Sequence, residues 1–460
     1  MDRVPFSYNG IQLIIPNDYN PNFNSFTVLI GSNGVGKSRL LSGLSGSLIE
    51  KTISTPTNVA DYAYENKLLA NQPKVITVST SPFDTFKLPS KTNRRFQESF
   101  NYHYIGMRGT FSNSSSISLI SSAAIGLLDK LLNSQGFDRL AKIFEVLGFE
   151  PSLEFIFKPM FRFNHNEAAS QRSIFDSQDA DELDIEKMLG VKLDRKLHYI
   201  IRDLDPYSLD EIRNALYIFS EFSDRRGHFR LRASYTNHWH YAFDFEHGAN
   251  HQILNATLTL LKYELIKLMD LKLFKMHIEM EMSLRRASSG EQCMLVIMLG
   301  IAGHITDYSQ IFIDEPEISL HPQWQEKFMS LLIEVFSTYT GCNFFIATHS
   351  PQIIAKLDQR NCYITSLTKH TIYSAADYMD RSADYQLAEL FDTPGAMNEY
   401  LVRMAFGLMS RVKSNKEVTS KDLIELNKLT SFIDKIEAKD PLLGLINTVS
   451  EMCEYYAPHY

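Results

Sequence analysis

The sequence predicts an α/β fold with a mixed β-sheet, a compact, mainly helical insertion and a helical C-terminal tail. Three observations predict it. The apolar run 26–30 leads into a glycine-rich loop and then into a helical pattern over 37–49. Two more apolar runs, 311–313 and 342–347, end in polar residues, as buried strands of such sheets do. Helical spacing dominates the long stretch between the first apolar run and residue 311, and it also dominates the chain after residue 381.

Composition narrows the class of protein. The chain has 460 residues, 44% hydrophobic and 22% charged, which is enough for two or three domains with a large core. Its four cysteines form no C-x-x-C pair, which argues against a zinc site and for a reducing compartment. We find no leader-like or membrane-spanning apolar run and expect a cytoplasmic protein without a membrane partner. The net charge is −8, so the surface as a whole does not attract nucleic acid, and any nucleic-acid binding must use a local basic patch.

The loop after the first strand has phosphate-binding spacing. GSNGVGKS, residues 31–38, fits G-x-x-x-x-G-K-S, whose glycines turn the backbone so that N–H groups point at an anion. Lys37 would reach the β and γ phosphates of ATP, and Ser38 would offer its hydroxyl to Mg²⁺. A glycine-rich turn without a ligand is the alternative, which the order strand, loop, helix disfavours. The predicted ATP-binding residues here are Asn33, Gly34, Gly36, Lys37, Ser38 and Arg39.

A second motif opens a helix near residue 288. In RRASSGEQ, Ser288 with Glu291, or Ser289 with Gln292, has capping-box spacing, so backbone N–H groups would face outward at the helix start. An ordinary capped helix is the alternative. The motif resembles the S-S-G-E-Q signature of ABC-type ATPases, and that resemblance implies that Ser289, Gly290 and Glu291 contact the γ-phosphate held by another subunit.

Two carboxylates follow the strand 311–313. Asp314 and Glu315 stand at its end, where adjacent side chains project in opposite directions and suit two separate tasks. The stretch resembles a Walker B motif, which implies that Asp314 holds Mg²⁺ and that Glu315 is the general base. The following EPEISLHP, residues 315–322, resembles the SMC, RecF and OLD-like branch of ABC-type ATPases rather than transporters.

A histidine follows the strand 342–347. His349, within ATHSPQII, resembles the switch histidine that hydrogen-bonds the γ-phosphate. A histidine after a strand is usually structural, but the order of the four motifs favours the catalytic interpretation.

Together the motifs resemble an ABC-type ATPase head formed by residues 1–90 and 276–380. The resemblance implies an ATP-bridged two-fold dimer, alone or within an assembly of dimers. One motif of the family is missing, because the strand after Lys74 carries Ser79, Thr80 and Ser81 where a Q-loop glutamine is expected. This gap and the long insertion disfavour a transporter ATPase.

We predict that residues 91–275 form the insertion within the ATPase head. Helical spacing runs over 126–148, with a break at Gly136, and again from Ser208 and from Asn255 to Leu271. Residues 152–163 predict a strand or hairpin, which an acidic loop around Asp176 to Glu186 follows. Two clusters within it have competing interpretations. One cluster consists of His238, His240, His247 and His251. It could form a metal site or an HNH-like nuclease, but the alternation of residues there fits a half-buried strand better. The other consists of Arg225, Arg226, Arg230 and Arg232; it could bind DNA backbone, but a solvated face is the better interpretation, and the case for DNA binding by Arg94 and Arg95 is weaker still.

Residues 381–460 predict a helical tail, without the strand-borne acids that a Toprim nuclease needs. The exposed aromatic end fits docking to a partner. The head, the compact insertion and DPLLGLI in the tail resemble the PtuA family of AAA-type ATPases from the antiphage Septu system. This resemblance implies a nucleotide-gated scaffold for a separately encoded HNH endonuclease, PtuB. The alternative is a DNA-repair or chromosome-type ATPase that clamps DNA itself.

Overall fold

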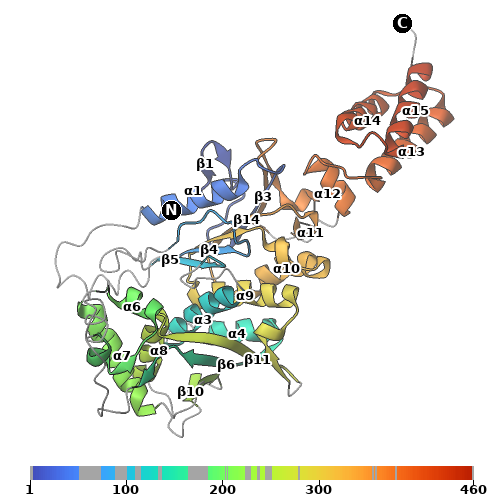
Figure 1. Cartoon of the computed structure of the whole chain (residues 1–460). Coiled ribbons are helices and arrows are strands. Elements are labelled where there is room, and N and C mark those ends of the chain that lie inside the picture. The colour runs from blue at the N-terminus through green and yellow to red at the C-terminus, as the bar shows by residue number, and fades with distance from the viewer. Residues whose placement is uncertain are drawn as a thin grey trace. The chain divides into compact units, whose positions relative to one another are not determined.

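The computed structural model describes most of the chain (Figure 1). The described residues are 4–50, 74–88, 101–108, 116–132, 137–163, 185–202, 204, 206–222, 229–235, 239–243, 251–277, 280–354, 357, 360–378 and 381–457. None of the helices in these ranges is long and apolar enough to cross a bilayer.

The predicted α/β fold is confirmed. The main sheet has seven strands in the order β16-β15-β3-β14-β13-β4-β5, and β3 pairs in parallel with both β14 and β15. Its strands are β3 (Ser25–Ile30), β4 (Val75–Ser79), β5 (Tyr102–Gly106), β13 (Gln310–Asp314), β14 (Asn343–Ala347), β15 (Cys362–Ser366) and β16 (Thr371–Ser374). The chain divides into two compact units, which are described separately below.

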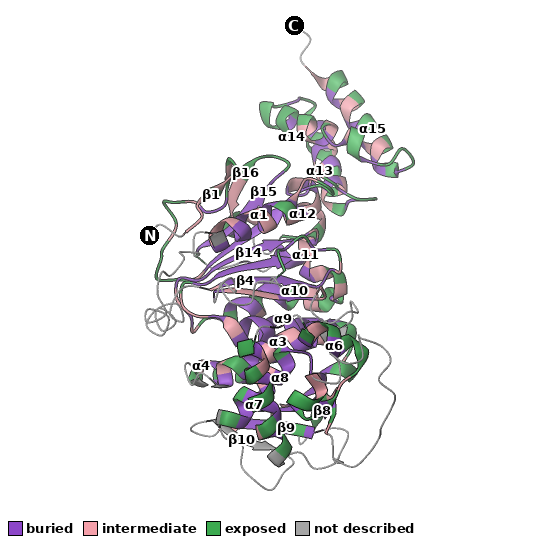
Figure 2. Ribbon diagram, turned by 60° about the vertical axis from the view of Figure 1, so that its left-hand side comes forward, coloured by how far each residue is buried: buried purple, intermediate pink, exposed green. Residues whose placement is uncertain are grey.

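The first unit comprises Met1–Lys51, Phe312–Ser330 and Thr340–Tyr460. Every residue of β3, β14 and β15 is buried, because helices and loops cover both faces of these strands (Figure 2). Around them lie β1 (Ser7–Tyr8), β2 (Ile11–Gln12), α1 (Lys37–Glu50), the 3₁₀ turns η2 (Pro316–Ser319) and η3 (Ala375–Tyr378), α11 (Pro351–Ile354), α12 (Ala383–Glu389) and, as far as Ser330, α10 (Pro322–Val335).

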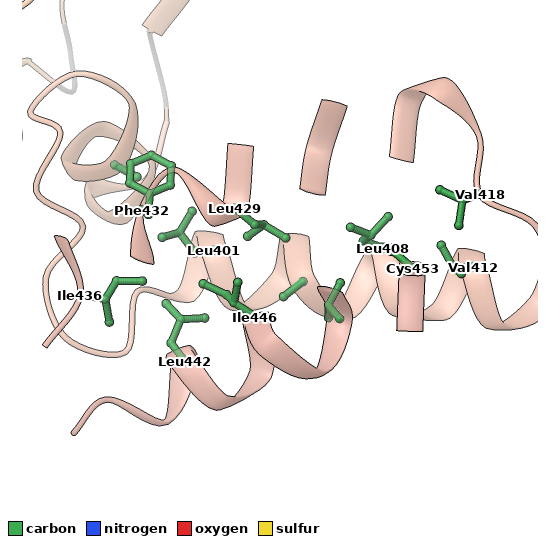
Figure 3. Packing of buried hydrophobic residues seen from close by; sticks show 13 residues of the cluster. Leu401, Leu408, Val412, Val418, Leu429, Phe432, Ile436, Leu442, Ile446 and Cys453 are labelled. Carbon is green, nitrogen blue, oxygen red and sulfur yellow. The ribbon is translucent and has the colours of Figure 1, made fainter. Parts of the chain in front are cut away.

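The tail forms helices, as predicted, and these helices share a hydrophobic core. They are α13 (Glu399–Asn415), α14 (Ser420–Thr430), η4 (Ile433–Lys435) and α15 (Pro441–Tyr456). Leu401, Leu408, Leu429 and Ile446 are fully buried where α13, α14 and α15 meet (Figure 3). Thr419 and Asp422 close a reciprocal capping box at the start of α14.

The second unit comprises Thr52–Ile311 and Leu331–Tyr339. It has a five-stranded antiparallel sheet in the order β10-β9-β6-β11-β12 and a small β7-β8 pair. The strands are β6 (Phe149–Pro159), β7 (Arg162–Phe163), β8 (Val191–Lys192), β9 (Phe229–Tyr235), β10 (Trp239–Phe243), β11 (Ile266–Lys275) and β12 (Glu281–Ser283). The helices are α3 (Ser116–Leu132), α4 (Phe137–Val146), α6 (Arg195–Arg202), α7 (Pro206–Phe222), α8 (His251–Lys262), η1 (Leu284–Arg286) and α9 (Ser289–His304).

This sheet adds to the mainly helical insertion that the sequence predicts. The helix expected from Asn255 to Leu271 is wrong in its second half, because α8 ends at Lys262 and β11 begins at Ile266. Glu264 reverses the chain with a positive φ of 62°. A bulge lies between Leu268 and Asp270, so the buried positions shift from two-residue to three-residue spacing and imitate a helix. The other predicted helices and strands of the insertion are confirmed.

The predicted domain boundaries at residues 90, 275 and 380 stay predictions. Several sequence motifs lie outside the described residues: Arg94 and Arg95, Gly136, the acidic stretch 176–184, Arg225 and Arg226, His238 and His247, and the last three residues.

Candidate nucleotide-binding site

Three neighbouring strands end at one edge of the sheet within the first unit and deliver the predicted site residues there. β14 lies between β3 and β13, so the loop after each of these strands emerges beside the other two. Backbone hydrogen bonds join the loops, since the Thr348 N–H donates to Leu29 O (3.2 Å) and the Glu315 N–H donates to Ala347 O (2.9 Å). The glycine-rich loop, Asp314, Glu315 and His349 are thereby brought together, and their roles toward ATP stay predictions.

The loop after β3 requires glycine at two positions in particular. Gly34 has a φ of +78°, which side chains rarely adopt. At Gly31 a Cβ would stand 2.9 Å from the Val35 side chain and 3.0 Å from Thr368 Oγ1. The backbone therefore takes the tight path of a phosphate-binding loop, with Asn33 exposed on it and Arg39 exposed on the first turn of α1.

Lys37 opens α1 and turns back over this loop. Its Nζ donates to the carbonyl oxygens of Gly31 (2.9 Å) and Ser32 (3.4 Å) and lies 3.3 Å from His349 Nδ1. Burial lowers the pKa of Lys37, and the nearby carboxylates, Glu315 first, oppose this shift. The ammonium is thus held where phosphate oxygens would meet it.

Ser38 and Asp314 form the candidate Mg²⁺ site. Ser38 Oγ donates to Asp314 Oδ1 at 3.0 Å, and Asp314 is buried at the end of β13. A hydroxyl and a carboxylate are oxygen ligands of the kind that Mg²⁺ prefers. In the described ranges no three His, Cys, Asp or Glu side chains group to hold a metal. The pair therefore fits Mg²⁺ that also takes water and phosphate oxygens as ligands.

His349 lies between Lys37 and Glu315. Its Nε2 is 3.5 Å from Glu315 Oε1. Burial, and then the charge of Lys37, lower the pKa of His349, so the ring is neutral at physiological pH. Because an ammonium only donates, Nδ1 accepts from Lys37 and the ring proton sits on Nε2, facing Glu315.

The backbone at Glu315 is unusual. Its φ of 47° and ψ of 56° are left-handed, although Pro316 follows and normally favours an extended residue before it. Such strain at a polar strand end is typical of functional residues. The two neighbouring carboxylates have different partners, since Asp314 accepts from Ser38 whereas Glu315 lies beside His349.

Glu317 also belongs to the site, although the sequence analysis gave it no role. Its Oε1 accepts the backbone N–H of His349, and burial raises the pKa of Glu317. Gln325 donates to Leu320 O (2.9 Å) and accepts from Ser350 Oγ (2.7 Å), on the other side of the same turn. Glu317, Gln325, Ser350 and His349 line a cavity of about 350 Å³. In the sequence, the signal that could have indicated a role for Glu317 is its place as the second glutamate of EPE, residues 315–317.

The signature motif lies in the second unit. Ser288 caps α9 and accepts the Glu291 N–H at 3.3 Å, so the structure selects the first of the two predicted capping pairs. Ser289 is exposed at the helix start, Gly290 is buried, and Glu291 Oε1 lies 4.0 Å from Lys275 Nζ. The role of Ser289, Gly290 and Glu291 toward another copy stays a prediction.

The strand expected to carry a Q-loop ends in structural contacts. Ser79, Thr80 and Ser81 are buried, and Thr80 hydrogen-bonds the Cys293 side chain on α9. The Ser81 N–H donates to Ser79 Oγ at 3.1 Å. These contacts connect the end of β4 with the signature helix inside the second unit.

Two of the predicted basic and histidine clusters are partly described. Arg230 pairs with Glu154 (3.7 Å), and the Arg232 guanidinium stacks 4.6 Å from the Phe274 ring. His240 lies on the strand β10, which confirms the predicted strand, while its half-buried character stays a prediction. Local contacts on the sheet thus engage both described arginines.

Comparison with known proteins agrees with this geometry. Residues 160–355 match the family model described as "AAA domain, putative AbiEii toxin, Type IV TA system". An Escherichia coli protein, "Retron Ec83 probable ATPase", is 22% identical over 415 residues, covering 78% of this chain and 70% of that protein. The family match and this relative support ATPase activity for an AAA-type domain on this α/β fold.

Proposed function

We propose that this chain is an ATP-hydrolysing regulatory and scaffold subunit of an antiphage defence complex, which controls a separately encoded HNH-type endonuclease. One observation carries the ATPase part. Lys37, Ser38, Asp314, Glu315 and His349 converge within one compact unit, with the contacts of 3.0 to 3.5 Å described above.

Each residue has a distinct role in the proposed reaction. Lys37 binds the β and γ phosphates as a point charge. Ser38 and Asp314 hold Mg²⁺, which when bound neutralises charge on the phosphate oxygens. Glu315 takes a proton from the attacking water as general base. His349 donates its Nε2 proton toward the γ-phosphate, which its neutral tautomer allows.

A second copy of the chain completes the proposed site. The exposed start of α9 offers Ser289 and the N-terminal end of a helix, which suits a phosphate oxygen. In the proposed two-fold dimer, Ser289, Gly290 and Glu291 of each copy face the glycine-rich loop of the other.

The nuclease partner rests on the resemblance to PtuA and on the retron in the relative's name. We propose that the partner is similar to PtuB and docks on the C-terminal helices. Large apolar side chains are exposed there: Phe406 on α13, Leu423 and Ile424 on α14, and Tyr455 on α15, each 47% exposed or more. Surfaces of this kind are typical of protein interfaces.

Plasmid cleavage tests the proposal. We would assay this chain, the nuclease encoded beside it, and the pair, over a titration of ATP. We expect cleavage by the pair only, and restraint at millimolar ATP that is released as ATP falls. Cleavage by this chain alone would refute the scaffold role, and cleavage by the pair that ignores ATP would refute the gating.

Substitutions in the tail test the docking surface. Phe406→Glu with Ile424→Glu should abolish capture of the nuclease while ATP hydrolysis stays unchanged. The matched control is Lys413→Glu with Lys421→Glu, exposed positions on the same two helices. Equal capture by both variants would exclude this surface. A chain that closes on DNA with ATP and binds no nuclease would favour the DNA-clamping alternative.

A further inference from the structure

Two strand pairs of the second unit hold like charges directly opposite each other. Lys158 of β6 faces Lys267 of β11. Arg162 of β7 faces Lys192 of β8. Opposed like charges destabilise a sheet. Within the described part of the chain none of the four forms an ion pair.

Helix α6 adds basic side chains near the start of β11, because its Lys196 Nζ lies 3.5 Å from Glu264 Oε2 in the turn before that strand. It begins shortly after β8 and buries Leu197, His198 and Ile201. Its outward stripe is Arg195, Tyr199 and Arg202, at the i, i+4, i+7 spacing of one helix face. Tyr199 is 72% exposed between the two arginines. A polar face alone does not require an exposed aromatic ring at its centre.

We propose that this basic strip, formed by Lys158, Lys267, Arg162, Lys192, Arg195, Tyr199 and Arg202, binds single-stranded nucleic acid. Phosphates compensate for the repulsion that the strand pairs carry, since a polyanion releases counterions when it meets such a surface. Tyr199 offers a face on which a base can stack, which favours single strands over duplex.

Charge complementarity supports this occupant. The whole chain has a net charge of −8, so a local strip with one sign is not a consequence of composition. The two acidic residues of 185–202 are used internally: Glu186 pairs with His198 (3.2 Å), and Asp194 accepts the Leu197 N–H (2.9 Å). The basic strip is distinct from the nucleotide site and does not depend on the proposed function.

Fluorescence anisotropy of a labelled oligothymidylate of about 20 nucleotides, with the full chain, tests the proposal. Arg195→Glu with Arg202→Glu should weaken binding at least about tenfold between about 50 and 200 mM salt and flatten the salt dependence. The control Lys142→Glu with Arg213→Glu, on α4 and α7, makes the same charge change and should bind like wild type. Tyr199→Ala should weaken single-strand binding with an unchanged salt slope.

Lys267→Gln separates function from structure. Removing one charge of an opposed pair should raise the thermal midpoint and lower oligonucleotide affinity together. A raised midpoint with unchanged affinity, or wild-type binding by the α6 variant, would overturn the proposal. The chain's own acidic stretch 176–184 is a competing occupant. If the wild-type chain did not bind the oligonucleotide and a variant with these acids replaced by amides did, the acidic stretch rather than nucleic acid would be the occupant of the basic strip.

Discussion

At the scale of single residues, Glu315 combines an unusual backbone conformation with the proposed role of general base, which requires a well-oriented carboxylate. Its backbone is left-handed, with a φ of 47°, and its Oε1 lies 3.5 Å from His349 Nε2. Glu315→Gln removes the base but keeps the shape. We expect phosphate release to fall by about 10²- to 10³-fold, while ATP stays bound and dimers accumulate on size exclusion. Hydrolysis at the wild-type rate would contradict the assignment.

Glu317 acts at the same scale, as a positioning residue. Its Oε1 accepts the backbone N–H of His349, and burial raises the pKa of this carboxyl. Glu317→Ala leaves the His349 N–H without that acceptor, so kcat should fall by about tenfold with little change in KM. Glu317→Gln retains an acceptor oxygen and should restore most of the rate. Equal loss in both variants would mean that the negative charge, not the acceptor, matters.

At the scale of elements, α9 has a supported C-terminal end. Lys130 donates to Ala302 O (2.9 Å), Ile305 O (3.0 Å) and the Tyr339 hydroxyl (2.9 Å), which satisfies carbonyl groups that a helix end leaves open. Next to it, the rings of His304 and His103 stack 3.9 Å apart. The signature helix is thereby attached to α3 and β5 within the second unit.

This arrangement predicts acid sensitivity. Burial, then the charges of Lys130 and Lys74, lower the pKa of His304 to about 3. In the unfolded chain this histidine has a pKa near 6.5, so below that pH the unfolded state binds a proton that the folded state does not bind. The free energy of unfolding therefore falls as pH drops from 6.5 toward 3. By pH 5 the loss should be about 1–2 kcal/mol. Thermal melts of His304→Asn should depend less on pH, and those of the exposed control His321→Asn should match wild type.

At the scale of the whole molecule, the proposed dimer predicts complementation. Lys37→Ala chains and Ser289→Arg chains should each be inactive, but their mixture should recover about a quarter of the wild-type rate, because each mixed dimer keeps one intact site. Mixing Lys37→Ala with Glu315→Gln should restore nothing, since both changes lie on the glycine-loop side of a site. Full-rate hydrolysis by a strict monomer would refute the sandwich.

The sequence by itself determined what depends on neighbours along the chain. The glycine loop after β3, the acids after β13 and the histidine after β14 follow from local patterns, because a buried strand ends where its apolar run ends. The same reasoning predicted the tail helices and the break between α3 and α4. It failed at β11, where the bulge after Leu268 changed the period of the pattern.

Only the tertiary structure decided what depends on residues far apart in the chain. Ser38 meets Asp314 across 276 positions, Lys37 selects the tautomer of His349 across 312, and Glu317 holds His349 across 32. The opposed charges of the basic strip likewise arise only when β6 pairs with β11. Sequence periodicity says which face of an element is buried, but hydrogen bonds and charge pairs depend on distances that the packing of several elements sets.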